Sequence, residues 1–315
     1  MDKKEIIYTF LLIFLIVIIF ASTVSAGFFD WFGKITGHAI SQNENITITI
    51  NGTTGVTVTI FNQTLAGTDP TEDSTTNIVF YVVVDDQDGV GDINDTSINT
   101  TVTASGETTR RNNTCSLISD LNSTAANFSC AVDMWYYDAS GAWTITVGAK
   151  DIGNQTYVYD TATFQFNQLQ AITIFPNSLT WATLNLGTTN QTSNNDPTVI
   201  NNTGNYNIAN ISIKGLNLHG DAVSTEYIDV GNFSVGNNTG SNLECNLVGA
   251  TPATLLVNGS NIGLNNATLN KGNHSVNDGT TGQEQLYYCL QEVPTTISSQ
   301  TYSTTNGGSW IIKLN

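Results

Sequence analysis

Short runs in which apolar and polar residues alternate dominate this chain beyond residue 44. Ile46, Ile48 and Ile50 alternate with threonines, and Trp143–Ala149 repeats the pattern with larger side chains. A period of two residues turns one face of a strand toward a core and the other toward solvent. No helical period follows the N-terminal segment. The chain is therefore predicted to be all-β.

Composition supports the same fold class. Lys and Arg number 9 against 26 Asp and Glu, which gives a net charge of −17, and only 11% of residues are charged. Thr, Asn, Ser and Gly replace the Lys, Arg and Glu that build exposed helices, and these residues favour strands and turns. The 40% hydrophobic content argues for folded cores. The negative charge disfavours nucleic-acid binding, which needs a basic face.

The N-terminus carries a targeting signal. Ile6–Ala26 is apolar and uncharged, Lys3 and Lys4 precede it, and Val24-Ser25-Ala26 resembles a cleavage site. Residues 1–26 are thus a signal peptide or, because the run is nearly long enough to span a bilayer, an uncleaved signal-anchor helix. Both alternatives place the rest of the chain outside the cell, secreted or tethered to the membrane.

Aromatic residues crowd the segment 27–44, where Phe28, Phe29 and Trp31 follow one another closely. Such a cluster suits the membrane interface, so this leader is predicted to be membrane-proximal. A flexible linker is the alternative.

Two domains are expected to follow. In residues 45–168 about eight short strands are predicted, including a hairpin around the turn Asn51–Gly55 and a central strand, Ile78–Val84, that is apolar on both faces. Regularly spaced strands of this kind indicate a β-sandwich. Residues 171–315 form the second predicted domain.

Strand candidates in the second domain lie on either side of the turn Asn202–Asn205. Residues 259–282 are predicted to be loops with at most one short strand. The later candidates are Phe233–Val235, Leu243–Leu247, Thr254–Val257, Leu286–Leu290 and Trp310–Leu314.

Three stretches resemble a known family. WTITVGAKDIGN (143–154) is similar to the late strands and turn of immunoglobulin-like (Ig-like) surface repeats in bacteria and archaea, and VVVDDQDGVGDI (82–93) resembles their early strand and acidic turn. AITIFPNSLTWATLNLGTT (171–189) resembles the start of Ig-like domains of archaeal secreted proteins. The resemblance implies two Ig-like β-sandwich domains in tandem and a role at the cell surface, but no chemistry.

Four cysteines, Cys115, Cys130, Cys245 and Cys289, allow three pairings. In an oxidising compartment an even number indicates disulfides. We favour Cys115–Cys130 and Cys245–Cys289, because each pair then lies within one domain. A zinc site is the weaker alternative, since no Cys-x-x-Cys spacing occurs.

Seventeen Asn-x-Ser/Thr acceptors behind a secretory signal predict a glycosylated surface, although an Asn- and Thr-rich chain makes some by chance. They are Asn45, Asn51, Asn62, Asn94, Asn99, Asn112, Asn122, Asn127, Asn154, Asn190, Asn201, Asn210, Asn232, Asn237, Asn258, Asn266 and Asn273.

An acidic turn is the one candidate metal site. Its residues are Asp85, Asp86, Asp88, Asp92 and Asp95, to which Asp69, Glu72, Asp73 or Asp151 could be added by folding. Calcium accepts such oxygen ligands. A helix–loop–helix calcium loop is excluded, because Val84 would stand at its first ligand position. A looser calcium site and a solvated acidic turn both stay open.

Catalysis finds little support. His38, His219 and His274 form no known catalytic motif and are interpreted as surface residues. The densest aromatic region, Trp135–Tyr137 with Trp143, either stacks on a sugar or fills a core.

The sequence thus predicts a non-enzymatic extracellular surface glycoprotein, a structural or adhesive part of the cell envelope, whose partners are other surface proteins, glycans or copies of itself. A carbohydrate- or ligand-binding module, with calcium as a cofactor, is the alternative. A secreted hydrolase would need two carboxylates facing each other across a cleft.

Overall fold

The computed structural model describes residues 11, 54–61, 67–153, 156–237 and 243–315. Three predicted segments lie outside these residues. They are the signal segment apart from Leu11, the leader 27–44, and the first strand of the predicted hairpin. Within them, no helix is long and apolar enough to cross a membrane. The chain divides into Met1–Ile50 and a second compact unit, Asn51–Asn315, which carries the whole of the fold described below.

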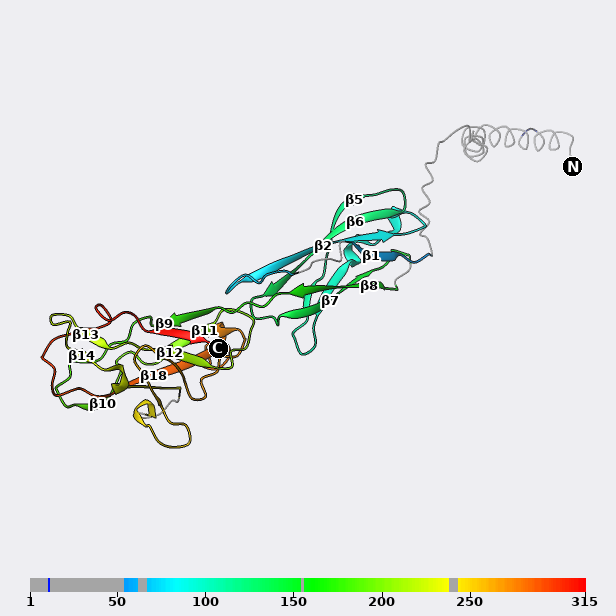
Figure 1. Ribbon diagram of the computed structural model, residues 1–315. Helices are drawn as coiled ribbons and strands as arrows, with labels where there is room; N and C mark the ends of the chain where they lie inside the picture. The colour runs from blue at the N-terminus through cyan, green and yellow to red at the C-terminus, as the bar shows by residue number, and fades with distance from the viewer. Residues whose placement is uncertain (1–10, 12–53, 62–66, 154–155, 238–242) are drawn as a thin grey trace. The chain divides into compact units, whose positions relative to one another are not determined.

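The structure is all-β, as predicted, and the first half of the compact unit contains eight strands in its described residues. β2 and β6 are the longest, and in each of them a buried apolar residue recurs at every second position, from Ile78 to Val84 and from Phe128 to Met134 (Figure 1). The strands are β1 (Thr57–Phe61), β2 (Thr75–Asp85), β3 (Asn99–Thr103), β4 (Arg110–Asn112), β5 (Ser116–Asp120), β6 (Ala125–Trp135), β7 (Gly141–Ala149) and β8 (Val158–Phe166).

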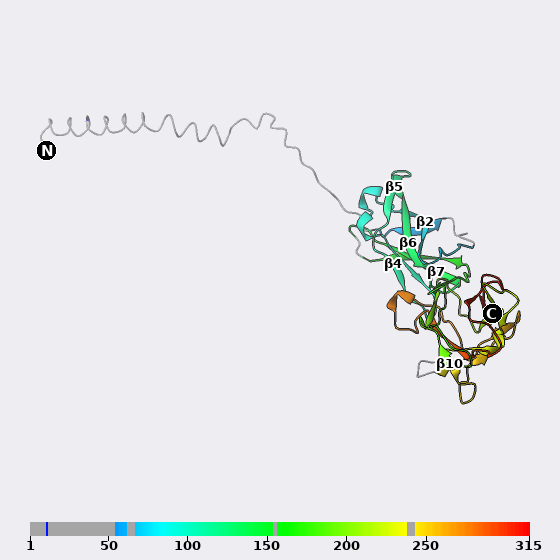
Figure 2. The same cartoon turned by 90° about the vertical axis from the view of Figure 1, so that its left-hand side faces the viewer.

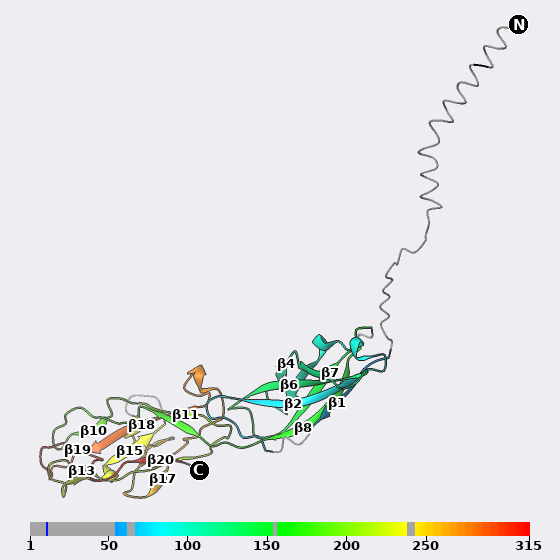
Figure 3. The ribbon, with the colours of Figure 1, turned by 90° about the horizontal axis from the view of Figure 1, so that it is seen from above.

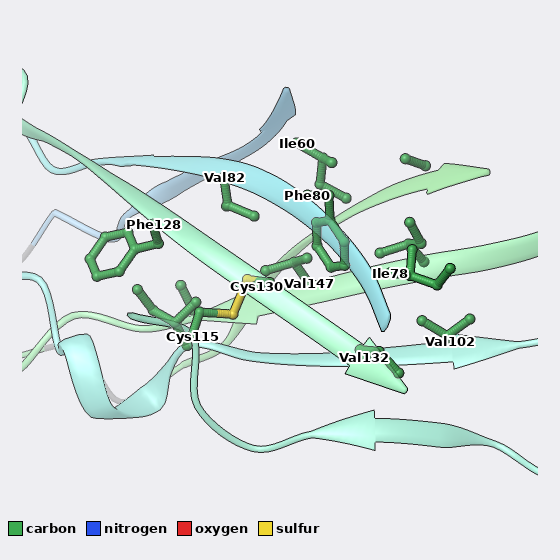
Figure 4. Packing of buried hydrophobic residues seen from close by; sticks show 14 of the residues in the cluster. Ile60, Ile78, Phe80, Val82, Val102, Cys115, Phe128, Cys130, Val132 and Val147 are labelled. Atoms are coloured by element: carbon green, nitrogen blue, oxygen red, sulfur yellow. A yellow bond between two sulfur atoms is a disulfide. The ribbon is translucent and has the colours of Figure 1, made fainter. Parts of the chain in front are cut away.

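These strands form two antiparallel four-stranded sheets, in the orders β1-β2-β6-β5 and β4-β3-β7-β8. Figures 2 and 3 show β2 and β6 running side by side. One hydrophobic cluster collects the inward side chains of both sheets, so the sheets pack against each other. Figure 4 shows Phe80, Val82 and Phe128 of the first sheet meeting Val102 and Val147 of the second.

The outward faces of β2 and β8 carry exposed aromatic or apolar residues. The strand predicted over Ile78–Val84 is central, but Val79 and Tyr81 on its outward face are exposed. In β8, Ala162 and Phe166 are buried whereas Tyr159 is exposed and stacks on Tyr157. A run apolar on both faces therefore does not require burial on both faces.

The second half of the unit has shorter strands. They are β9 (Ile172–Phe175), β10 (Thr189–Thr192), β11 (Thr198–Asn202), β12 (Ile211–Lys214), β13 (Leu218–Gly220), β14 (Tyr227–Ile228), β15 (Phe233–Gly236), β16 (Thr254–Leu255), β17 (Asn261–Gly263), β18 (Gln283–Glu292), β19 (Tyr302–Ser303) and β20 (Ile311–Leu314).

Five 3-10 turns, two in the first half and three in the second, complete the described elements. They are η1 (Val90–Asp92), η2 (Asp95–Ser97), η3 (Val230–Asn232), η4 (Leu243–Cys245) and η5 (His274–Val276).

Three sheets build this half. A six-stranded sheet has the order β16-β15-β18-β11-β9, with β10 also paired to β18, and two three-stranded sheets have the orders β17-β12-β20 and β14-β13-β19. Their inward residues form a second hydrophobic cluster around Ile200, Phe233 and Leu286. The strand expected over Leu243–Leu247 is wrong, because its start is the turn η4 and no strand follows. Residues 259–282 contain one short strand, β17, as predicted.

Both predicted disulfides are present, Cys115–Cys130 and Cys245–Cys289, and no described cysteine is free. Figure 4 shows the first of them inside the hydrophobic cluster, near Phe128 and Val147. Each bond lies within the half of the chain to which the sequence assigned it. The hydrophobic clusters lie on either side of residue 170 in sequence, but the domain boundaries themselves stay a prediction.

Candidate functional site

The acidic turn follows β2 directly. Asp85 ends the strand with its side chain half-exposed, and Asp86 is the next residue, with 0% of its surface exposed. The alternation of β2 explains the difference, because consecutive side chains point to opposite faces. Gly89 then turns the chain at a φ of 129°, a conformation that other residues rarely adopt.

Main-chain hydrogen bonds fix this turn on its neighbours. The amide of Asp86 donates to the carbonyl of Thr124 at 2.8 Å, and the amide of Val90 donates to the carbonyl of Ser123 at 2.8 Å. Gly89 returns a bond to the Asp86 carbonyl at 3.0 Å. The carboxylates are therefore held by a defined backbone.

Asp86 is a buried carboxylate with incomplete hydrogen bonding. Its Oδ1 accepts the amide of Asp88 at 2.9 Å, whereas Oδ2 has no hydrogen-bond partner among the described residues. Burial raises the pKa of Asp86, and the negative charges of Asp151, Asp88 and Asp92 raise it further, although the Asp88 amide acts in the opposite direction.

Folding brings Asp151 to this turn. An antiparallel bridge pairs it with Ile93, and the amide of Ile152 donates to the carbonyl of Asp92 at 2.8 Å. Asp151 is 1% exposed, and its Oδ1 accepts the amide of Gly153. Of the four residues named as additions, Asp151 alone joins the turn.

The other three lie elsewhere. Asp69, Glu72 and Asp73 precede β2, and the 11 residues of that strand separate them from the turn by roughly 35 Å at 3.2–3.4 Å a residue. Asp95, also predicted as a ligand, is exposed in η2. Burial and the charge of Asp120 raise its pKa.

Within the described residues, no group of three or more His, Cys, Asp or Glu side chains is already arranged to hold a metal ion.

A polar junction connects residues around the two hydrophobic clusters. Thr203 Oγ1 donates to Glu72 at 2.7 Å, and the amide of Asp73 donates to the Thr203 carbonyl at 3.1 Å. His274 Nε2 is hydrogen-bonded to Asp73 Oδ1 at 2.7 Å, and an ion pair joins Lys271 to Glu107 at 2.8 Å. These contacts relate the first half of the unit to the second.

Asn205 adds two bonds to this junction. Its Oδ1 accepts the amide of Leu169 at 2.7 Å, and its Nδ2 donates to the carbonyl of Asn167 at 2.9 Å. Gly204 beside it packs closely, since a Cβ there would lie 2.2 Å from the Leu169 carbonyl oxygen. The predicted turn at Asn202–Asn205 is thus also the place where the chain between the clusters is anchored.

The histidines are less exposed than expected. His274 is partly buried beside Asp73, and its amide donates to the hydroxyl of Tyr136 at 3.4 Å. Desolvation raises the pKa of Tyr136 to about 12, so this phenol is neutral at physiological pH. His219 contacts the carbonyl of Ser224 through Nδ1 at 2.7 Å. His38 lies outside the described residues.

The aromatic region divides into two parts. Trp143 is 1% exposed and its Nε1 donates to the carbonyl of Ala139, so it fills the core. Trp135 is 40% exposed and stacks on Tyr137 with ring centres 5.7 Å apart and an angle of 15° between the planes. Arg110 lies over the Tyr137 ring. One exposed stacked pair therefore remains available to a ligand.

A second pair of buried carboxyls was not predicted from the sequence. Asp196 Oδ1 and Glu244 Oε2 are buried and have no hydrogen-bond partner among the described residues. Burial raises the pKa of Asp196 to about 6, and the charge of Glu244 contributes. The two residues lie 48 positions apart and follow no motif, so no sequence signal could have paired them.

Glycosylation acceptors keep to accessible positions. Thirteen of the seventeen belong to the described residues and none of them is buried. The buried asparagines, Asn202 and Asn205, do not begin an acceptor triplet. Asn45, Asn51, Asn62 and Asn154 lie outside the described residues.

No protein-family model matches this chain, and comparison with curated proteins gives no match.

Proposed function

We propose that this chain is a non-enzymatic extracellular surface glycoprotein that serves as a structural or adhesive component of the cell envelope. The observation that carries the proposal is the placement of the acceptor asparagines: none of the thirteen described is buried. Glycan transfer needs an accessible asparagine, and every described acceptor meets that requirement. The two disulfides fit an oxidising compartment.

Strand order supports an Ig-like assignment for the first half. Numbered by letters, β1-β2-β6-β5 reads A-B-E-D, and β3-β7-β8 reads C-F-G with β4 added at the edge. The immunoglobulin sandwich has sheets with the orders A-B-E-D and C-F-G, so the strand order supports this part of the proposal. In the second half, the described strands form three sheets in other orders, so the proposal of an Ig-like fold rests on the resemblance alone there.

Contacts with a partner would use the first sheet. All five residues of its edge strand β5 are exposed, among them Leu117 and Ile118. Phe61, Val79 and Tyr81 add apolar surface on the outward face of the same sheet. An exposed edge with apolar side chains pairs readily with another strand. Another surface protein or a second copy of the chain would supply that strand.

The test starts from native cells. Glycopeptide mass spectrometry of the purified chain should find glycans at exposed acceptors such as Asn122 and Asn190, and protease treatment of intact cells should release peptides of the compact unit. A chain recovered from the cytosol with free thiols and no glycans would refute the proposal. Electron microscopy of the glycosylated protein then separates the two roles: ordered sheets or filaments favour a structural component, and dispersed monomers an adhesive one.

The exposed Trp135–Tyr137 pair favours one second candidate, a carbohydrate-binding module. Stacked exposed rings offer a flat apolar surface to a sugar ring. Affinity electrophoresis in gels that contain soluble polysaccharide would test it. Retardation that Trp135→Ala abolishes, and that the exposed control Tyr206→Ala leaves intact, would support binding. No retardation in any gel would count against it.

A further inference from the structure

The carboxyl of Asp86 is the most unusual polar group of the first half, because it is fully buried yet only half satisfied. One oxygen accepts a single amide and the other has no hydrogen-bond partner among the described residues. Leaving a buried charged group without a partner costs several kcal/mol in general terms. Such an atom is explained when something absent from the protein chain binds it.

The surroundings of Asp86 specify what that group would be. Three further carboxylates, those of Asp88, Asp92 and Asp151, lie close enough for their charges to act on it. No lysine, arginine or histidine among the described residues forms an ion pair with Asp86. Negative charge gathered around a buried carboxyl favours a cation and opposes every anionic ligand.

We propose that Asp86 and Asp151, together with Asp88 and Asp92, form a calcium site between the turn after β2 and the turn after β7. Asp86 is the central ligand. Asp151 reaches it through the bridge to Ile93, which joins segments that are nearly 60 residues apart in sequence. This inference does not depend on the proposed surface function.

Calcium fits this set better than other common ions. The donors are oxygens only, whereas zinc and copper sites use Cys or His. Calcium accepts six to eight oxygens in flexible geometry, including main-chain carbonyls and water, whereas magnesium demands a near-ideal octahedron. Four carboxylates repel one another, so the ion itself would draw them together and water would complete its shell.

Two of the predicted ligands are left out by the structure. Asp85 points away from Asp86 on the strand, and Asp95 feels the charge of Asp120 and not that of the cluster. Asp95→Asn is therefore a matched control, since it removes the same charge a few residues from the site.

The experiment uses the full chain in mild detergent and follows intrinsic tryptophan fluorescence during heating, with CaCl2, with MgCl2 or with chelator. Calcium should raise the Tm by several degrees, with a Kd on the order of 0.1–1 mM as in extracellular calcium modules. Magnesium should have a much smaller effect. Titration calorimetry on the same protein measures the Kd directly.

Relative to the wild type, Asp86→Asn should have opposite effects on the Tm in chelator and in calcium. A substitution whose effect is only structural should shift the Tm in the same direction under both conditions. In chelator the variant should melt above the wild type, because a buried unpaired charge is gone. In calcium the wild type should melt higher, because the variant binds at least ~10-fold more weakly. Asp88→Asn, at an exposed residue whose change leaves folding intact, should also weaken binding if Asp86→Asn does not fold.

Two results would overturn the site. One is a wild type that shows neither a change in Tm nor heat of binding up to 20 mM CaCl2, taken as roughly twenty times the weakest expected Kd. The other is a loss of affinity in Asp95→Asn as large as that in Asp88→Asn, since this would mean diffuse attraction of cations to an acidic surface.

Discussion

Each half of the compact unit has its own hydrophobic cluster, and the two clusters are enclosed by very different strands. Around the first, β2 and β6 run for 11 residues each and β7 and β8 for 9. Around the second only β18 is long, and the other strands have two to five residues. Long alternating strands carry their own ladder of hydrogen bonds, whereas short ones leave the backbone to be satisfied by other means.

In the second half of the unit, hydrogen bonds from side chains take over part of this role. Glu226 accepts bonds from Ser298, Gln300 and Tyr302. Asn195 accepts the amide of Thr180 and donates to the carbonyl of Ser178. The second disulfide closes a separation of 44 residues against 15 for the first. The comparison teaches that a β core can be held by regular ladders or by loops fastened with polar side chains.

The largest expected effect tests whether both cores are equally tight. Trp143→Ala in the first and Phe233→Ala in the second each remove a fully buried ring, and each should cost about 3–5 kcal/mol of unfolding free energy. Urea unfolding measures both. Val248→Ala, at an exposed residue, should change stability by less than about 0.5 kcal/mol. A cost near 1 kcal/mol for Phe233→Ala would mean that the second core is loosely packed.

The next largest effect is expected from the disulfides, which should contribute unequally to the stability of the two halves. In the loop-entropy model, removing Cys115–Cys130 by paired alanines costs about 3 kcal/mol and removing Cys245–Cys289 about 4 kcal/mol, because the second bond closes the longer loop. The same urea titration measures each double variant. If loss of the first bond proves more costly, loop length is not what these bonds contribute.

Burial of the Asp196 carboxyl destabilises the second half of the unit at neutral pH. With its pKa raised to about 6 from 3.8, the protonated carboxyl favours the fold; this contribution is full below pH 3.8 and is lost as the pH rises through 6. Asp196→Asn should therefore stabilise the protein at pH 7 by about 1 kcal/mol, a figure reduced for solvent screening, and have little effect at pH 4. Thermal unfolding at both pH values checks this. Glu292→Gln, an exposed control, should show no such pH dependence.

Glu226 is expected to give the smallest effect. Hydrogen bonds from the Ser298 hydroxyl and amide, then from Tyr302, lower its pKa to about 2. Its contribution to stability is present above pH 4.5 and is lost as the pH falls through 2. Glu226→Gln should be slightly less stable than the wild type at pH 7, and the two should converge in acid unfolding curves near pH 2. Curves that run parallel throughout would separate Glu226 from the stability of these loops.

The sequence predicted the strands of the first half better than those of the second half. In the first half, apolar patterning marked the strands now seen as β2 and β7, because each inward residue reports its own burial. No prediction covered β4 or β5. In the second half, Leu243–Leu247 has the apolar content of a strand but begins as a turn. Such short segments are positioned by partners distant in sequence.

The candidate sites divide in the same way. The sequence by itself determined the fold class, the presence of disulfides and the acidic turn, because composition, cysteine count and local charge can be read without the fold. The favoured pairing of the four cysteines depended on the expected domain boundary, and the structure confirmed it. Only the tertiary structure decided that Asp86 is buried beside Asp151, that Asp95 stands apart, and that Trp143 fills a core while Trp135 faces solvent. Burial and charge proximity arise from contacts between segments many residues apart, and a linear pattern carries no record of those contacts.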